Sequence, residues 1–481
     1  MKYSLRHITA LPLTALLLLC GCAGESYPGM TYDRTMSPDI INEESGKTGD
    51  RGIEIELYIA PDSFALGSPT RGTGPFVVPD TTRRDSNHYE NSFFHVFAFR
   101  ASPDDQGPLT YMPDYRRRSN DPTDQKANCL IDNNNDFNIG LPAQLDDNRS
   151  GRLRFRCFDT RSNLWNDTLL HYNINTSNIG YNFYAYYIDD FKPSDANTSR
   201  TGEGICYNID LDGTRDLMYG VAPRLTPAVL DYLTEKDNLM IGEESRTRII
   251  NNSYYTGYAA YYGVRPYVQL HHALTRLRFQ AFPADATCDS VTIESIEVQC
   301  RNKAHLWIVR PNNGDLGITF EPEYNYVTLM DPHPSQAPDS IGKYPYVPLG
   351  TETNTVTWKP EYEGTDWKTN EPKTIGGDML VATDSVYRMK LTYRQTLRNK
   401  NPLTGKNIVN RMTSTYDLYA PETDLSYDAN AGRHMYLPGH TYNINIGIYG
   451  LRAIVVNTGM EGWQEGEDIP PNTEDDFDRS Q

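Results

Sequence analysis

Apolar and polar residues alternate in short runs along most of the chain. The clearest runs are Ile53–Ile59 and Tyr442–Ile448, in which every second residue is aliphatic or aromatic. Successive side chains of a β-strand point to opposite faces, so each run places its apolar residues on one face. Similar runs predict strands at Phe93–Phe99, Arg152–Phe158, Tyr181–Ile188, Leu274–Phe282, Val291–Cys300, His305–Val309, Thr355–Lys359, Val386–Tyr393 and Ile454–Thr458. Together with 31 Pro and 35 Gly residues that punctuate the chain, this pattern is typical of antiparallel β structure.

One segment carries the signals of a helix. Thr226 is a suitable N-cap, and Pro227 suits the first helical position. The apolar residues that follow, up to Leu233, predict about three helical turns.

The length of 481 residues allows two domains of ordinary size, each with its own core. The pattern breaks near Pro266, where a Tyr-rich stretch gives way to a new β-rich run. We therefore predict an all-β fold of two antiparallel β-sandwich domains, residues 72–265 and 266–463, with one short helix. The acidic, Pro-containing tail, residues 464–481, is predicted to be disordered.

The N-terminus has the pattern of an export signal. Lys2 and Arg6 precede an apolar run, and small residues and two cysteines follow it, which predicts a signal peptide over residues 1–21. The sequence Leu19-Cys20-Gly21-Cys22 resembles a lipobox, in which Cys22 would be lipidated and become the new N-terminus. The alternative is an ordinary secretory peptide cut near Ala23.

Charge and cysteine usage narrow the function. The net charge of −18 opposes binding to nucleic acid, which we exclude. Five cysteines follow the signal peptide, and none has the spacing of a metal site. We interpret them as small core residues or one incidental disulfide.

Candidate chemical motifs are weak. Asp132–Phe137 places oxygen ligands at alternate positions, but it lacks the Gly and the Glu of an EF-hand. Asp210–Gly213 is first a turn signal. His271 and His272 would point to opposite faces of a strand and could not share a metal. No motif of a hydrolase is present, so the sequence predicts neither an enzyme nor a cofactor or metal site.

The region between Cys22 and the first domain is the most informative. The strand Ile53–Ile59 is followed by a linker of small residues, Pro61–Pro75, that contains one Arg, Arg71. A second strand follows at Phe93–Phe99. Two further arginines, Arg83 and Arg84, lie in the same connection.

The order of lipobox, alternating strand, Arg in a linker and second strand resembles the precursors of the fimbrillin family, lipoprotein subunits of type V pili. Leu270–Phe279 is similar to the strand that opens the family's C-terminal domain. Leu437–Ile446, followed by Gly462-Trp463, is similar to its C-terminal signature, and Asp216–Gly220 fits more loosely.

This resemblance implies two sandwiches of transthyretin-like topology and export to the outer membrane at the cell surface. It implies that an Arg-specific protease cuts at Arg71, with Arg83 or Arg84 as alternatives, so that residues 22–71 form a propeptide. Release of its strand would leave a groove that a strand from another pilus subunit fills. The groove-filling side chains would be Ile53, Ile55, Leu57 and Ile59. The expected role is a non-enzymatic fimbrial subunit that contributes to adhesion.

Two alternatives remain open. The acidic tail does not resemble a strand that could be donated, so the donor would be the Tyr442–Thr458 region, or absent. Without a donor the chain would serve as a tip subunit, and without cleavage as a membrane anchor held by Cys22. A surface glycan-binding lipoprotein would instead use exposed aromatic rings, with Trp307, Trp358 and Trp367 as candidates.

Overall fold

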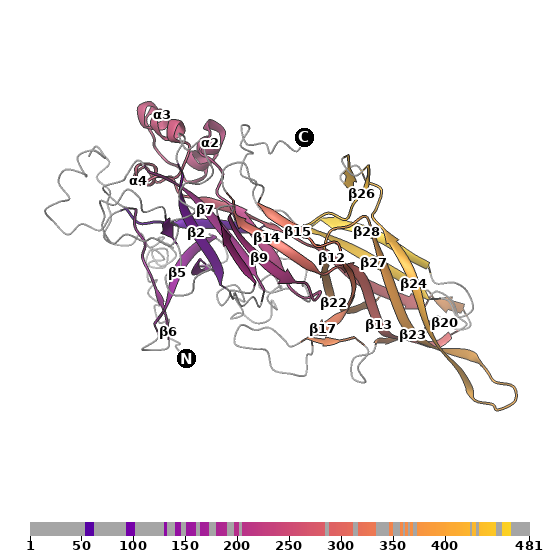
Figure 1. Cartoon of the computed structure of the whole chain (residues 1–481). Helices are drawn as coiled ribbons and strands as arrows, with labels where there is room; N and C mark the ends of the chain where they lie inside the picture. Colours follow the sequence, from indigo (N-terminus) through magenta and orange to yellow (C-terminus); the bar gives the residue numbers. More distant parts are fainter. Residues whose placement is uncertain are drawn as a thin grey trace, which may run out of the picture. The chain divides into compact units, whose positions relative to one another are not determined.

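The computed structural model describes residues 53–61, 93–101, 129–131, 140–145, 151–159, 164–172, 179–189, 197–201, 204–283, 288–310, 316–332, 346–349, 356–358, 361–363, 366–368, 373–423, 426–429, 432–448 and 455–462 (Figure 1). These residues form the strands β1 to β28 and the helices α2 to α4. Within these ranges, no helix has the length and apolar character needed to cross a membrane.

The first half of the chain is organised around one nine-stranded sheet. Its strand order is β1-β11-β10-β7-β2-β4-β5-β6, with β3 beside β2, and β1 also pairs with β5. This last pairing closes seven strands of the sheet, β1, β11, β10, β7, β2, β4 and β5 in spatial order, into a ring. The strands are β1 (Leu57–Pro61), β2 (Phe94–Ala101), β3 (Cys129–Ile131), β4 (Leu141–Leu145), β5 (Arg152–Asp159), β6 (Leu164–Asp167), β7 (Gly180–Ile188), β10 (Leu217–Val221) and β11 (Tyr267–His272).

Alternation along these strands gives the ring an apolar interior. Phe94, Val96 and Ala98 of β2 point to the same face and are fully buried. Phe183 and Ala185 of β7 join them in one cluster. The ring therefore encloses the core of the first half.

A second sheet packs against the outside of β2 and β7. It has the order β15-β14-β9-β8, from β8 (Thr198–Thr201), β9 (Gly204–Asp210), β14 (Lys303–Val309) and β15 (Gly317–Phe320). Tyr186 of β7 meets Tyr207 of β9, with their hydroxyl oxygens 3.0 Å apart in a buried hydrogen bond. β9 precedes the predicted domain boundary at residue 266 and β14 follows it, so this sheet contains strands from both sides of that boundary. The boundary itself stays a prediction.

The second half of the chain has two larger sheets with a common core. One has the order β22-β12-β27-β28 and the other β16-β13-β23-β24, with β19 beside β13. Leu277 of β12 and Ile444 of β27 pack in the same buried cluster as Ile293 of β13 and Leu391 of β23. The strands are β12 (Thr275–Pro283), β13 (Cys288–Arg301), β16 (Tyr324–Thr328), β19 (Val356–Trp358), β22 (Lys373–Val381), β23 (Val386–Lys400), β24 (Asn407–Tyr419), β27 (His440–Ile448) and β28 (Val455–Gly462).

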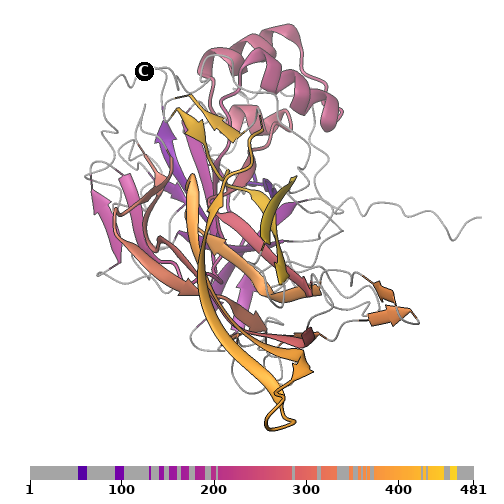
Figure 2. The same ribbon diagram turned by 90° about the vertical axis from the view of Figure 1, so that its right-hand side faces the viewer.

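Three short pairs complete the strands: β17 (Met330–Pro332) with β18 (Tyr346–Pro348), β20 (Glu361–Glu363) with β21 (Asp366–Lys368), and β25 (Tyr427–Asp428) with β26 (Arg433–His434). Figure 2 shows β23 and β24 continuing as a hairpin past their neighbours.

The expected helix is confirmed as α2 (Pro227–Lys236), with the Thr226 hydroxyl accepting a hydrogen bond from the backbone N–H of Val229. The expectation of one helix is wrong, because the described residues also form α3 (Glu243–Asn252) and α4 (Gly257–Tyr261). In α3 only Ile249 is buried, so its sequence has no apolar stripe. Helix α4 is too short to show a period and depends on its Thr256 cap.

The predicted β-rich class is confirmed, and each predicted strand overlaps an observed one. The strand predicted at Ile53–Ile59 begins later than expected, because β1 starts at Leu57 and only an isolated bridge at Glu54 precedes it. Antiparallel pairing is wrong at two places, because β1 runs parallel to β11 and β12 runs parallel to β27. These partners are far apart in sequence, so no hairpin turn dictates their direction. The arrangement as two transthyretin-like sandwiches stays a prediction.

A histidine at the interface of the first two sheets responds to pH. The His95 ring stacks on Tyr186, with centroids 5.3 Å apart, and its buried Nδ1 has no hydrogen-bond partner among the described residues. Burial lowers the pKa of His95 from its usual 6.5 to about 4. The folded protein therefore favours neutral His95, and stability from this group is complete above pH 6.5 and decreases as the pH falls toward 4.

We expect the wild type to lose about 1 to 2 kcal/mol more of its free energy of unfolding between pH 7 and pH 5 than a His95→Gln variant does. Denaturant titrations at the two pH values measure this difference. His271→Gln, at an exposed position of β11, is the matched control and should keep the wild-type pH dependence. Equal pH dependence in wild type and His95→Gln would refute the assignment.

Candidate functional site

Strand β1 is bonded along both of its edges. On one edge it runs parallel to β11, with Tyr58 opposite Tyr267, and the Tyr58 N–H donates to the Pro266 carbonyl at 3.0 Å. On the other edge it runs antiparallel to β5, and the Ile59 N–H donates to the Gly151 carbonyl at 2.8 Å. The strand therefore fills a gap between β11 and β5.

The residues just before β1 extend this pairing. The Ile55 N–H donates to the Leu170 carbonyl at 2.8 Å, and the Tyr172 N–H donates to the Ile53 carbonyl at 2.8 Å. The whole segment from Ile53 to Pro61 is thus held by main-chain hydrogen bonds. We call its surroundings, from β5, β11 and residues 170–172, the β1 seat.

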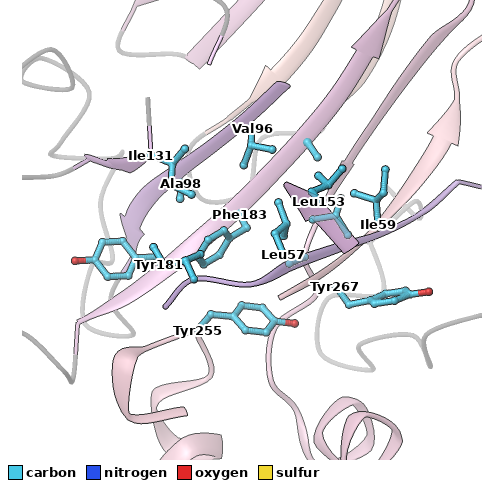
Figure 3. Packing of buried hydrophobic residues seen from close by; sticks show 14 of the residues in the cluster. Leu57, Ile59, Val96, Ala98, Ile131, Leu153, Tyr181, Phe183, Tyr255 and Tyr267 are labelled. Atoms are coloured by element: carbon cyan, nitrogen blue, oxygen red, sulfur yellow. The ribbon is translucent and has the colours of Figure 1, made fainter. Parts of the chain in front are cut away.

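The inward side chains of this segment belong to the core. Ile55, Leu57 and Ile59 are 2%, 0% and 1% exposed, and Ile53 packs against them while partly buried. Figure 3 shows Leu57 and Ile59 in the same cluster as Leu153, Phe183 and Tyr255. Burying an aliphatic side chain contributes about 1.5 to 3 kcal/mol, so the loss of these residues would uncover a large apolar surface.

The outward side chains contact two arginines. Arg152 Nη2 of β5 lies 3.5 Å from Glu54 Oε1 and 3.5 Å from Glu56 Oε1. Arg265, next to β11, forms an ion pair with Glu56, and its guanidinium carbon lies 5.9 Å from the Tyr58 ring centroid. We call Arg152 and Arg265 the arginine pair.

Other polar groups surround the outward side chains Glu54, Glu56 and Tyr58, which we call the outer row. Burial raises the pKa of Asp237, the C-cap residue of α2, while the charge of Arg265 lowers it and that of Glu56 raises it. Burial also raises the pKa of Tyr58, against the opposing effect of Arg265. Lys236 Nζ lies 4.1 Å from the ring centroid of Tyr267, the partner of Tyr58 in the register. The outer row is therefore partly withdrawn from solvent.

Gly151 lets β5 approach β1 closely. Its φ is +67°, and a Cβ atom there would lie 2.2 Å from the carbonyl oxygen of Ile59. A side chain at this position would strain the backbone and press on β1 at the same time.

The sequence predicts a strand with Ile53, Ile55, Leu57 and Ile59 on one face. In the structure Leu57 and Ile59 lie in β1, while Ile55, just before it, is buried in the same cluster and Ile53 packs against that cluster while partly buried. Their role as groove-filling side chains stays a prediction. Cys22, Arg71, Arg83 and Arg84 lie outside the described residues. Arg152, Arg265 and Gly151 also belong to the site, and no motif in the sequence marks them. The available signal was the alternation of Glu with aliphatic residues over Ile53–Leu57, which indicates cations near the outward face of this segment.

The other candidate motifs have structural roles where they are described. His272 is buried, with its Nδ1 3.0 Å from Asp216 Oδ1, whereas His271 points outward. Asp212 Oδ1 accepts from the Thr214 N–H at 2.9 Å and closes the predicted turn. Asp132–Phe137 lies outside the described residues. The described part of the chain contains no group of His, Cys, Asp or Glu side chains placed to hold a metal ion.

Two of the cysteines are described in full. Cys206 and Cys300 are buried and free, as expected of small core residues. Burial raises the pKa of Cys206 to about 11 and that of Cys300 to about 12, which keeps both thiols protonated near neutral pH.

We expect Gly151→Ala to lower the free energy of unfolding by at least about 2 kcal/mol, from the strained φ and the contact with Ile59. Gly405→Ala is the matched control, because Gly405 has a φ of +66° and a Cβ there would meet nothing within 4 Å. The control should lose about 1 kcal/mol, from backbone strain alone. Denaturant unfolding measures both, and equal losses would show that Gly151 has no special contact with β1.

Comparisons with known proteins find similar structures at low sequence identity. No protein-family model and no curated protein matches the chain. A Bacteroides uniformis protein assigned to cell adhesion is 11% identical, with 85% of this chain and 99% of that chain covered and a TM-score of 0.35. The tip fimbrial protein Mfa3 of Porphyromonas gingivalis is 9% identical, covering 85% and 100%, with a TM-score of 0.29. The fimbrial anchor protein Mfa2 of the same organism is 9% identical, covering 85% and 97%, with a TM-score of 0.25. The structural neighbours of this chain thus include cell-adhesion and fimbrial proteins.

Proposed function

We propose that the chain is a non-enzymatic fimbrial subunit that assembles by exchanging β1 for a strand of another subunit. It is exported as an outer-membrane lipoprotein through Cys22, processed by an Arg-specific protease, and contributes to adhesion at the cell surface. The observation that carries the proposal is the position of β1, which closes a ring of strands by hydrogen bonds along both of its edges.

The covalent connection of β1 supports this proposal. β1 ends at Pro61 and β2 begins at Phe94, and Arg71 lies between them, as do Arg83 and Arg84. A cut at any of these arginines separates β1 from all later strands. After the cut only hydrogen bonds, ion pairs and apolar contacts hold β1, so another strand of similar pattern can replace it.

The physical basis of assembly is the open seat that β1 would leave. Its departure exposes main-chain groups along β5 and β11 together with the apolar lining around Leu153 and Phe183. Unpaired strand edges beside an apolar groove bind extended segments readily. The same seat that stabilises the precursor would then hold neighbouring subunits together.

Two variants of this role depend on processing. An uncleaved chain would remain attached through the lipid of Cys22 and act as an anchor. A cleaved chain with no strand of its own to donate would act as a tip. Glycan binding has less support, because the Trp307 ring is covered by Arg310, whose guanidinium carbon lies 4.0 Å from the ring centroid.

We expect limited digestion of the purified chain with an Arg-specific protease to cut at Arg71 and to convert monomers into oligomers. The Arg71→Ala variant should keep the segment from Ile53 to Pro61 covalently attached and stay monomeric. Mass spectrometry of the new N-terminus and light scattering of the products provide the readouts. Arg83→Ala with Arg84→Ala is the control and should behave as the wild type. Equal oligomer formation by the Arg71→Ala variant would refute Arg71 as the processing site.

A further inference from the structure

The arginine pair is not part of β1 and remains when β1 leaves. Arg152 is the first residue of β5, and Arg265 lies two residues before β11. These two strands are the opposite edges of the β1 seat. A strand that enters the seat therefore lies between two strands that each have one of these arginines at or near their start.

Loss of β1 changes the charge at this place. It removes the two carboxylates that lie 3.5 Å from Arg152, those of Glu54 and Glu56, and Glu56 is also the ion-pair partner of Arg265. Lys236 adds a third cation beside Tyr267, while Asp237 supplies a negative charge near Arg265. Among these described groups, three cations then face one carboxylate, so positive charge is in excess on the outward side of the seat.

Because these charges are partly buried, they can discriminate between incoming strands. The side chains of Arg152, Glu54 and Glu56 are 24%, 21% and 22% exposed, and Glu56 Oε2 is shielded from solvent. Ion pairs in such positions are screened less than fully exposed ones. An incoming residue with a neutral or positive side chain would leave the arginines without these partners, and this disfavours wrong strands.

The other features of the seat do not discriminate in this way. Main-chain hydrogen bonds along β5 and β11 accept almost any extended segment. The interior that holds Ile55, Leu57 and Ile59 accepts many aliphatic patterns. Among the described contacts of the segment, those of Glu54 and Glu56 alone require a particular charge at particular positions.

We propose that Arg152 and Arg265 select the strand that replaces β1. The partner is an extended segment of another subunit that has aliphatic residues at alternate positions and carboxylates at two successive outward positions between them. Glu54 and Glu56 hold these positions in the precursor, so β1 occupies the seat as a template of the strand that follows it. This inference rests on the proposed release of β1.

The test is a competition with synthetic peptides on the full chain after Arg-specific processing. One fluorescent peptide has the sequence of residues 52–61, and the second carries Glu54→Gln and Glu56→Gln. We expect the native peptide to bind the processed chain about tenfold more tightly, as a few partly buried ion pairs would provide. We also expect this preference to shrink as the salt concentration rises.

Variants of the chain identify the arginines as the source of the preference. With Arg152→Gln and Arg265→Gln together, the two peptides should bind within about twofold of each other. Arg246→Gln is the matched control, because Arg246 forms an ion pair with Asp231 of α2 instead of with β1. This control should keep the tenfold preference. Arg152→Glu should reverse the choice in favour of a peptide with Glu54→Lys and Glu56→Lys.

The outcomes separate the inference from the proposed function. If neither peptide enters the processed chain, strand exchange fails and the selection by the arginines fails with it. If both peptides enter with equal affinity in the wild type, strand exchange stands and the selection alone is overturned. A preference that persists in the double variant would also overturn the role of the arginine pair.

Discussion

The closure of the first sheet by β1 is the constraint on which the first half of the molecule depends. β1 supplies main-chain partners to β5 and β11 at once, and its aliphatic side chains fill the centre of the ring. Without it, the ring would be an open sheet with two free edges and an uncovered apolar face. The covalent link between this strand and all later strands is the connection from Pro61 to Phe94.

The two faces of the segment Ile53–Pro61, which ends in β1, have different roles. The inward row of Ile55, Leu57 and Ile59 contributes stability through burial, which is largely indifferent to sequence detail. The outward row of Glu54 and Glu56 meets the arginine pair, and this contact depends on charge and position. Stability and selectivity are therefore separated on the two sides of one strand, as the strand period of two residues allows.

Much of the fold could be predicted from local patterns. The alternation in Ile53–Ile59 gave both the strand and its buried face, and Thr226-Pro227 gave the start of α2. Parallel pairing of β1 with β11 could not be predicted, because it joins segments far apart in sequence. For the same reason the sequence did not identify Arg152 and Arg265, although the alternating glutamates indicated nearby cations, since each arginine joins the site only when β5 and β11 lie on either side of β1. The helix α3 was missed because its helical residues are mostly polar.

The most direct measurement is mass spectrometry of subunits taken from filaments on the surface of producing cells. If β1 is exchanged during assembly, these subunits begin at Gly72, and peptides covering residues 53–61 are absent from them. Subunits in filaments that still carry residues 53–61, joined to the rest of the chain, would contradict the release of β1.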